Sequence, residues 1–139
     1  MKKNILSLAL ISLLLLTGCG KKVYNCQKNI LDTDGVKVDR EVSLTYNNKK
    51  ITKEVITVKY KTSNIDGVKK PVQEQYEAYN NAKGINYYFE DVDDGFNFVI
   101  EIDMQKADKN IKEELELYTD DAKKVINDLE KDGYTCTNK

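Results

Sequence analysis

Residues 85–104 read INYYFEDVDDGFNFVIEIDM, two runs of alternating apolar and polar residues on either side of an Asp-Gly pair. Alternation with a period of two is typical of strands that bury one face, and Asp-Gly favours a two-residue hairpin turn. A turn at Asp94-Gly95 predicts one apolar face, with these pairs: Ile85 with Met104, Tyr87 with Ile102, and Phe89 with Ile100. Tyr88 then lies on the opposite, wet face. The segment predicts an antiparallel hairpin.

Three further strands are expected before this hairpin, over residues 23–29, 36–46 and 51–61. In the second of them five apolar residues share one parity, which indicates a half-buried strand: Val36, Val38, Val42, Leu44 and Tyr46. The third strand has mixed parity, because Ile51 and Val55 fall on one side and Ile56 on the other. We therefore expect a β-bulge near Glu54–Val55, where one extra residue exchanges the faces.

Two helices complete the predicted domain. Residues 71–83 have near-helical apolar spacing, with Pro71 suited to the first turn and Gly84 to the end. Residues 106–117 predict a connection with a short helical turn. The last helix is expected to be capped by Thr119, with Asp120 and Asp121 in its first turn. Its apolar stripe is formed by Ala122, Val125, Ile126 and Leu129, and Gly133 ends it.

The element order β-β-β-α-β-β-α predicts an α+β fold. We expect residues 23–139 to form a single domain, an antiparallel sheet of about five strands with two helices on one face.

The first residues have a different character from the domain. Lys2 and Lys3 precede residues 5–16, an apolar run of 12 residues that is shorter than the roughly 20 needed to span a bilayer. The run has the length of a secretory signal. Residues 16–19, Leu-Thr-Gly-Cys, resemble the lipobox of bacterial lipoproteins. That resemblance implies removal of residues 1–18, two acyl chains on Cys19, and a lipidated tether over residues 19–22.

We therefore expect the protein on a bacterial cell membrane, lipid-anchored and facing outside the cytoplasm. An ordinary cleaved signal with an incidental cysteine is the alternative.

Two cysteines remain after Cys19. In an oxidising compartment, Cys26 and Cys136 are expected to form a disulfide that joins the two ends of the domain. Two free thiols are an alternative. A redox role is disfavoured because the spacing is not Cys-x-x-Cys.

The composition excludes several classes of function. The chain has 22 basic and 23 acidic side chains and no histidine, which excludes His-dependent catalysis and His-ligated zinc. The formal net charge of -1 gives no reason to expect a nucleic-acid partner. Loss of Lys2 and Lys3 on cleavage would make the chain more acidic, so we expect only the acyl chains to touch the bilayer.

Three short motifs suggest a family. They are YNNKKITK at residues 46–53, Ile102-Asp103-Met104 at the end of the hairpin, and LEKDGY at residues 129–134. Together with the lipobox they resemble the YehR-like small bacterial lipoproteins, which have no assigned activity. The resemblance implies a compact α+β domain with an extracytoplasmic anchor, and it supplies no catalytic residues.

Nine tyrosines suggest a ligand surface. Tyrosine has an apolar body and a polar rim, so four of them are candidate contacts for a glycan or peptide: Tyr76, Tyr79, Tyr87 and Tyr88. The alternative is that they pack the margins of a small core.

Acidic residues near the hairpin turn suggest calcium. Asp91, Asp93, Asp94 and Glu101 partly match a calcium-binding loop, but Val92 stands where an oxygen ligand is required. We interpret them as a polar turn and expect no metal, no cofactor and no catalytic residue.

The function expected from these observations is non-enzymatic binding to, or support of, an envelope protein or glycan. The alternative is a module that binds a small solute, glycan or peptide through its tyrosines. An envelope hydrolase is the third hypothesis, and it requires two carboxylates that converge in a cleft.

Overall fold

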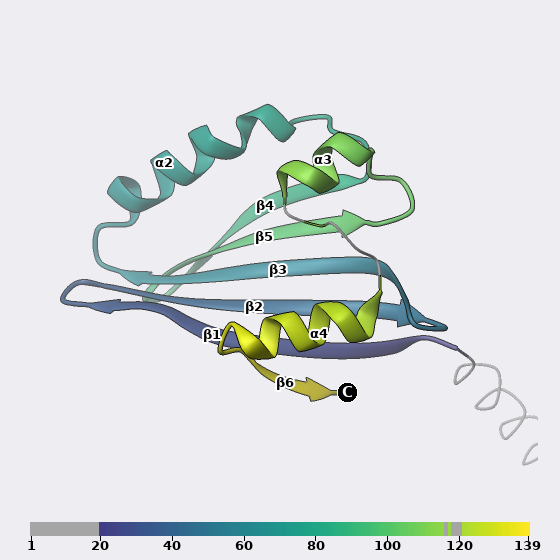
Figure 1. Ribbon diagram of the computed structural model, residues 1–139. Helices are drawn as coiled ribbons and strands as arrows, with labels where there is room; N and C mark the ends of the chain where they lie inside the picture. The colour runs from purple at the N-terminus through teal and green to yellow at the C-terminus, as the bar shows by residue number, and fades with distance from the viewer. Residues whose placement is uncertain (1–19, 116, 118–120) are drawn as a thin grey trace, which may run out of the picture.

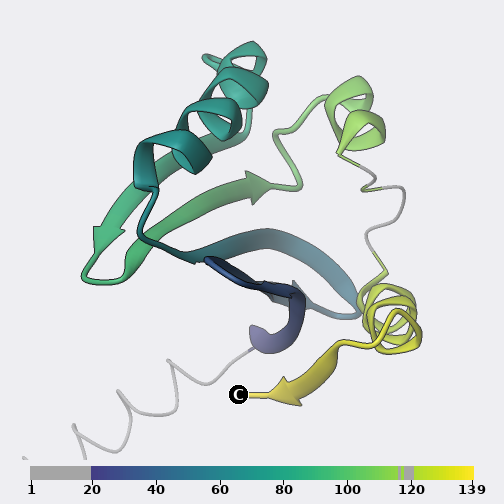
Figure 2. The same ribbon diagram turned by 90° about the vertical axis from the view of Figure 1, so that its left-hand side faces the viewer.

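The computed structural model describes residues 20–115, 117 and 121–139 of the chain. Over these residues the protein forms one six-stranded antiparallel sheet in the order β4-β5-β3-β2-β1-β6, with three α-helices on one face (Figures 1 and 2). The elements are β1 (Lys22–Thr33), β2 (Val36–Asn47), β3 (Lys50–Thr62), α2 (Ile65–Tyr76), a 3-10 turn (Glu77–Tyr79), β4 (Ile85–Val92), β5 (Gly95–Asp103), α3 (Lys109–Glu114), α4 (Ala122–Lys131) and β6 (Thr135–Asn138). The predicted α+β class and antiparallel sheet are confirmed.

The described residues contain one strand more than the expected five and one helix more than the expected two. The additional helix, α3, lies where a short helical turn was expected. The additional strand, β6, has the sequence Thr-Cys-Thr-Asn and pairs with β1 in register, Cys26 opposite Cys136. Four residues without apolar alternation carry no strand signal, so only the expected disulfide pointed to this pairing.

The two cysteines form the expected disulfide. Their sulfurs are 2.07 Å apart and their Cα atoms 4.0 Å apart. Lys139 N–H donates to the carbonyl of Val23, so the Cys26–Cys136 pair falls at a non-hydrogen-bonded position, where opposing side chains are closest. The bond joins the first strand of the domain to the last.

A β-bulge in β3 determines which side chains face the helices. Tyr46 pairs with Ile51 but Thr45 pairs with Lys53, so Thr52 is the extra residue. The expected bulge is confirmed, but its expected position near Glu54–Val55 is wrong. Because of the bulge, Ile51 and Glu54 both lie on the helix-covered face, and both are buried.

The second hairpin has the predicted faces but a different register. Ile85 pairs with Ile102 and Tyr87 with Ile100, so the turn is at Asp93-Asp94 and the predicted pairing is off by two residues. A shift of two keeps every side chain on its face. Gly95 is not a turn residue. It lies in β5 against Tyr60, whose carbonyl oxygen would be 1.8 Å from a Cβ at this position.

The first helix begins earlier than expected. α2 starts at Ile65, where the Asn64 side chain accepts a hydrogen bond from Gly67 N–H, and Pro71 is inside the helix. Proline there leaves the Gly67 carbonyl without its helical donor. Both residues are exposed, so water can supply that donor. Residues 71–83 are therefore not one helix: α2 ends at Tyr76 and the 3-10 turn follows.

The last helix is capped by Asp121, whose carboxylate accepts a hydrogen bond from Lys124 N–H. The expected cap Thr119 lies outside the described residues, as does Asp120. The predicted stripe is confirmed: Ala122 is buried and Val125, Ile126 and Leu129 pack on the core.

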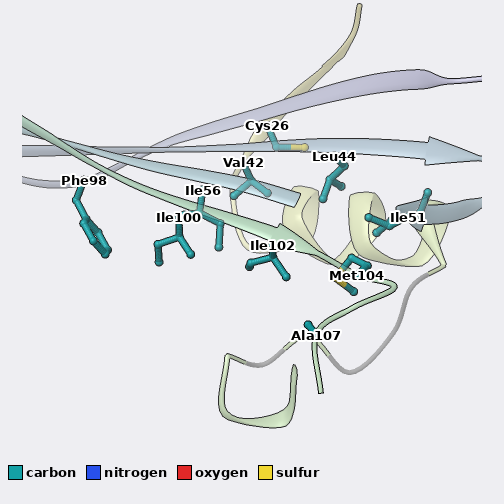
Figure 3. Close-up of a cluster of buried hydrophobic side chains, with 11 residues drawn as sticks. Cys26, Val42, Leu44, Ile51, Ile56, Phe98, Ile100, Ile102, Met104 and Ala107 are labelled. Carbon is teal, nitrogen blue, oxygen red and sulfur yellow. The ribbon is translucent and has the colours of Figure 1, made fainter. Parts of the chain in front are cut away.

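All the helices pack on one face of the sheet, and the core lies between them and the strands. Figure 3 shows Phe98, Ile100 and Ile102 of β5 beside Ile56 of β3 and Val42 of β2. The opposite face carries cross-strand ion pairs such as Lys59–Glu41, 2.9 Å apart, and Lys53–Glu101, 3.3 Å apart. Any pocket built with the helices therefore lies on the core side.

The amino-terminal segment is outside this description. The predicted signal peptide (residues 1–18) and lipidation site (Cys19) lie outside the described residues. Between residues 20 and 139, no described helix is both long and apolar enough to cross a bilayer.

Replacing Gly95 with alanine tests the close approach of β3 and β5. Gly95→Ala should lower the free energy of unfolding by about 3 kcal/mol or more, because the new methyl overlaps the Tyr60 carbonyl. Gly35→Ala is the matched control. Nothing lies within 4 Å of its Cβ, and its φ of +92° costs about 1 kcal/mol. Equal urea midpoints for the two variants would contradict the β3–β5 register.

Candidate functional site

A pocket of about 290 Å³ lies between α4 and strands β2 and β3. We call it the Glu54 pocket. Its lining combines apolar walls with charged groups and comprises Arg40, Val42, Glu54, Leu115, Leu117, Lys124, Val125, Asp128, Leu129, Asp132 and Tyr134. The volume is close to the lower end of the range for small-molecule sites in proteins.

Glu54 is the most unusual residue of this pocket. It is in phase with Ile56, Val58 and Tyr60 along β3, and the residue is only 6% exposed. Within the described part of the chain its carboxyl group has no hydrogen-bond or ion-pair partner. Burial raises the pKa of Glu54 from 4.5 to about 7, and the positive charge of Arg40 partly opposes this rise. A carboxyl buried without a partner is costly and therefore rare.

Arg40 supplies the second buried polar group. It lies on β2, opposite Val58 and two residues from Val42 on the same face. Its Nε is buried and has no hydrogen-bond acceptor among the described residues. The pocket therefore contains an acceptor at Glu54 and a donor at Arg40, and neither has a hydrogen-bond partner among the described residues.

Charged groups from α4 surround the pocket. Lys124, Asp128 and Asp132 line it, and all three are exposed. The ammonium group of Lys28, on β1, donates a hydrogen bond to the Asp132 carbonyl and lies 5.6 Å from the centre of the Tyr134 ring. This pairing of a cation with the carboxyl end of a helix fixes α4 against β1.

The arrangement permits two kinds of chemistry. An ionised Glu54 can bind a cationic group, while Arg40 donates to an oxygen and the leucine and valine walls cover an apolar portion. A carboxyl with a pKa near 7 can also transfer protons at neutral pH. Strongly perturbed groups in pockets are candidates for functional residues.

The sequence contained a signal for this site that the analysis of apolar periodicity omitted. Glu54 and Arg40 are charged residues in phase with apolar ones on neighbouring strands. From the sequence, Glu54 marked only the expected bulge and Arg40 was not singled out, whereas the structure places both in the lining of the pocket.

The four candidate tyrosines do not form one surface. Tyr76 packs against Tyr79 and Tyr87, with ring centres 5.7 and 6.2 Å apart, and lies 4.5 Å from Phe98 of the core. Burial and the Glu114 carboxylate raise the pKa of Tyr79. Tyr88 follows Tyr87 in β4, so it is on the opposite face of the sheet. Three of the four tyrosines are therefore together, and they pack on one another.

Two other tyrosines line a hollow that the sequence analysis missed. Tyr24 and Tyr46, with ring centres 6.3 Å apart, line a space of about 300 Å³ beside α4. Lys49, Lys123 and Glu130 lie around it. Tyr24 has the parity of Cys26, which was the available signal.

The acidic residues near the hairpin are not gathered around one point. Asp91 is paired with Lys69 at 2.9 Å and Asp94 with Lys61 at 3.3 Å, whereas Glu101 lies far along β5 and is paired with Lys53. Across the described residues, no group of three or more acidic, cysteine or histidine side chains is placed to hold a metal ion.

Comparison with protein-family models, curated proteins and solved structures finds no match to this chain. The site is therefore interpreted from its own geometry and chemistry.

The pH dependence of stability tests the burial of Glu54. Because its folded pKa lies above its unfolded value, the native state holds a proton that the unfolded state loses between pH 4.5 and about 7. The stability that this carboxyl contributes is present below pH 4.5 and is lost as the pH rises through 7. The loss should reach roughly 3 kcal/mol, and Glu54→Gln should remove it.

Urea unfolding at several pH values measures this effect. Glu130→Gln on the exposed side of α4 is the matched control and should keep the wild-type pH dependence. Parallel curves for the wild type and Glu54→Gln would show that Glu54 is not buried.

Proposed function

We propose that this protein is a lipid-anchored domain of the bacterial cell envelope that binds a small amine-bearing ligand in the Glu54 pocket. Binding, rather than catalysis, is its proposed role. The observation that carries the binding proposal is the Glu54 carboxyl, buried beside an open pocket with no partner among the described residues. Such a group is costly to the fold, and a ligand cation would satisfy it.

Two features support a location in the envelope. The lipobox-like residues 16–19 follow a positively charged and then apolar segment, as in lipoprotein signals. The Cys26–Cys136 bond agrees with an oxidising compartment, where structural disulfides persist. The resemblance to YehR-like lipoproteins points to the same location, and two acyl chains on Cys19 would suffice for stable attachment.

The proposed ligand follows from the pocket's groups. An amine cation would pair with ionised Glu54, and an oxygen on the ligand would accept from the guanidinium group of Arg40, which lines the pocket. Val42, Leu115, Val125 and Leu129 would cover a short aliphatic portion. A small zwitterion or amine with a hydrocarbon side chain has this combination.

A hydrolase is the second candidate. Asp128 and Asp132 line the same pocket as Glu54, so the third expectation, two carboxylates near one cleft, has some support. Two facts favour binding. First, the Asp128 carboxylate is exposed and lies 3.9 Å from the Lys131 ammonium group, so it is not held beside Glu54 in the pocket. Second, the chain has no histidine to share in proton transfer.

Titration with n-hexylamine, followed by amide NMR shifts in β2, β3 and α4, tests the proposal. The amine should bind more tightly at pH 8, where Glu54 is ionised, than at pH 5.5. Loss of the charge in Glu54→Gln should weaken binding roughly ten- to hundredfold. Glu130→Gln is the matched control and should bind as the wild type does.

Two outcomes would contradict the proposal. Binding of n-hexanol as tight as that of n-hexylamine would mean that the pocket recognises only the hydrocarbon chain. A Glu54→Gln variant that binds the amine normally would remove Glu54 from recognition. If Glu54→Gln keeps ligand binding but loses turnover of an envelope substrate, the hydrolase candidate replaces the binding one.

A further inference from the structure

The two ends of the sheet carry opposite charge. One end is where β1 begins at Lys22, and there the β2–β3 turn, the start of β4 and the start of α4 come together (Figure 1). Hydrogen bonds confirm this grouping: Ala122 N–H donates to the Lys49 carbonyl, and Asp103 N–H donates to the Gly84 carbonyl. We call it the anchor end, because the chain leads from it to Cys19.

Lysines are concentrated at the anchor end. Five of them are exposed and make no ion pair within the described residues: Lys21, Lys22, Lys49, Lys83 and Lys123. Lys53 and Lys106 line the same hollow as Lys21. Lys50, whose backbone forms an isolated β-bridge with Asp121, lies at the same end.

Acidic groups at the anchor end are mostly engaged. Glu101 is paired with Lys53 at 3.3 Å and Asp103 with Lys106 at 3.5 Å. Asp121 caps α4 and Glu130 lies beside Tyr24, while Asp108, which precedes α3, has no ion pair within the described part of the chain. Among the described residues, lysines therefore outnumber carboxylates at the anchor end, although the whole chain is slightly acidic.

The opposite end of the sheet carries the acidic excess. There the β1–β2 and β4–β5 turns lie together, since Gly35 and Asp94 line one hollow and Thr62 N–H donates to the Asp94 carbonyl. Six aspartates are exposed in this region: Asp32, Asp34, Asp66, Asp91, Asp93 and Asp94. Lysines in this region include Lys37, Lys61, Lys69 and Lys70. Lys61 is paired with Asp94, Lys69 with Asp91 and Lys70 with Glu74.

The distance to the proposed anchor makes this asymmetry effective. Only Gly20 and Lys21 separate Cys19 from β1. Three residue steps span at most about 11 Å. The Debye length at physiological ionic strength is about 8 Å, so charges at the anchor end would be only partly screened from lipid headgroups.

We propose that the lysine-rich anchor end binds the anionic phospholipid surface and holds the domain upright, with the aspartate-rich end pointing away. This inference rests on the proposed lipid anchor at Cys19. It replaces the expectation that only the acyl chains touch the bilayer, because that expectation used net charge and ignored its distribution. Lysines near an anionic surface each strengthen attachment by about fivefold.

Lysine acetylation of the lipidated protein in vesicles tests the orientation. The protein is placed in phosphatidylcholine vesicles or in vesicles rich in phosphatidylglycerol. It is then treated with an uncharged acetylating reagent that reacts with lysine amines, and the acetylated peptides are quantified by mass spectrometry. In the anionic vesicles, acetylation of Lys22, Lys49 and Lys83 should fall several-fold, whereas that of Lys37 and Lys70 should not change. The protection should disappear in ~1 M salt, where the Debye length is about 3 Å.

A charge-matched pair of variants shows whether the lysines cause the protection. Lys22→Gln/Lys49→Gln/Lys123→Gln should lose the protection of Lys21 and Lys83, and Lys37→Gln/Lys70→Gln/Lys131→Gln should keep it. The same acetylation in both vesicles, or protection of the same lysines by soluble polyphosphate but not by vesicles, would overturn the inference. A protein that does not co-sediment with either vesicle would instead disprove the anchor.

Discussion

The bond between Cys26 and Cys136 fixes the segment that builds the site. β6 has four residues and pairs only with β1, so the disulfide holds its position in the sheet. α4 precedes β6 directly, and its other end is held by the hydrogen bond from Ala122 to Lys49. Closing a loop of this length, 110 residues, stabilises a domain by roughly 4–5 kcal/mol in chain-entropy models. The wall of the Glu54 pocket therefore depends on a link that forms in an oxidising compartment.

The Glu54 pocket conflicts with the rule by which the rest of the domain folds. Elsewhere on this face the strands present apolar side chains to the helices, and the bulge at Thr52 keeps Ile51 in that set while also turning Glu54 inward. Burying a carboxyl there destabilises the native state at neutral pH. Natural proteins break such rules mainly where function requires it, which is the reason to assign the pocket a role.

The sequence predicted which side chains face the core better than it predicted the pairing register of the strands and the ends of the elements. The alternation in residues 85–104 determined which side chains are buried, and the two-residue error in register left this unchanged. Gly95 was assigned to the turn because its contact with Tyr60 of β3 is not visible in the hairpin alone. Pro71 was placed at a helix start because proline is favoured in the first turn. Its position inside α2 is tolerated because Pro71 and Gly67 are exposed to solvent, which the sequence does not show. Both errors arose where a neighbouring element or solvent decided the outcome.

The candidate site was less predictable than the fold. The tyrosines were chosen by composition, but the contacts of Tyr76 with Phe98 are tertiary, and Tyr88 faces away from the other three. Glu54 and Arg40 were visible as charged residues in phase with apolar neighbours. Their meaning depends on α4, which lies more than sixty residues later in the chain than Glu54. The charge asymmetry was hidden for the same reason, since its lysines come from separate segments.

The mass of the intact protein extracted from bacterial membranes tests most directly whether the domain is anchored and oxidised. The proposed anchor predicts a chain that begins at Cys19, carries a diacylglyceryl group there, and has lost two hydrogens at Cys26 and Cys136. A chain that retains residues 1–18, or one that carries no lipid and has free thiols at Cys26 and Cys136, would contradict it.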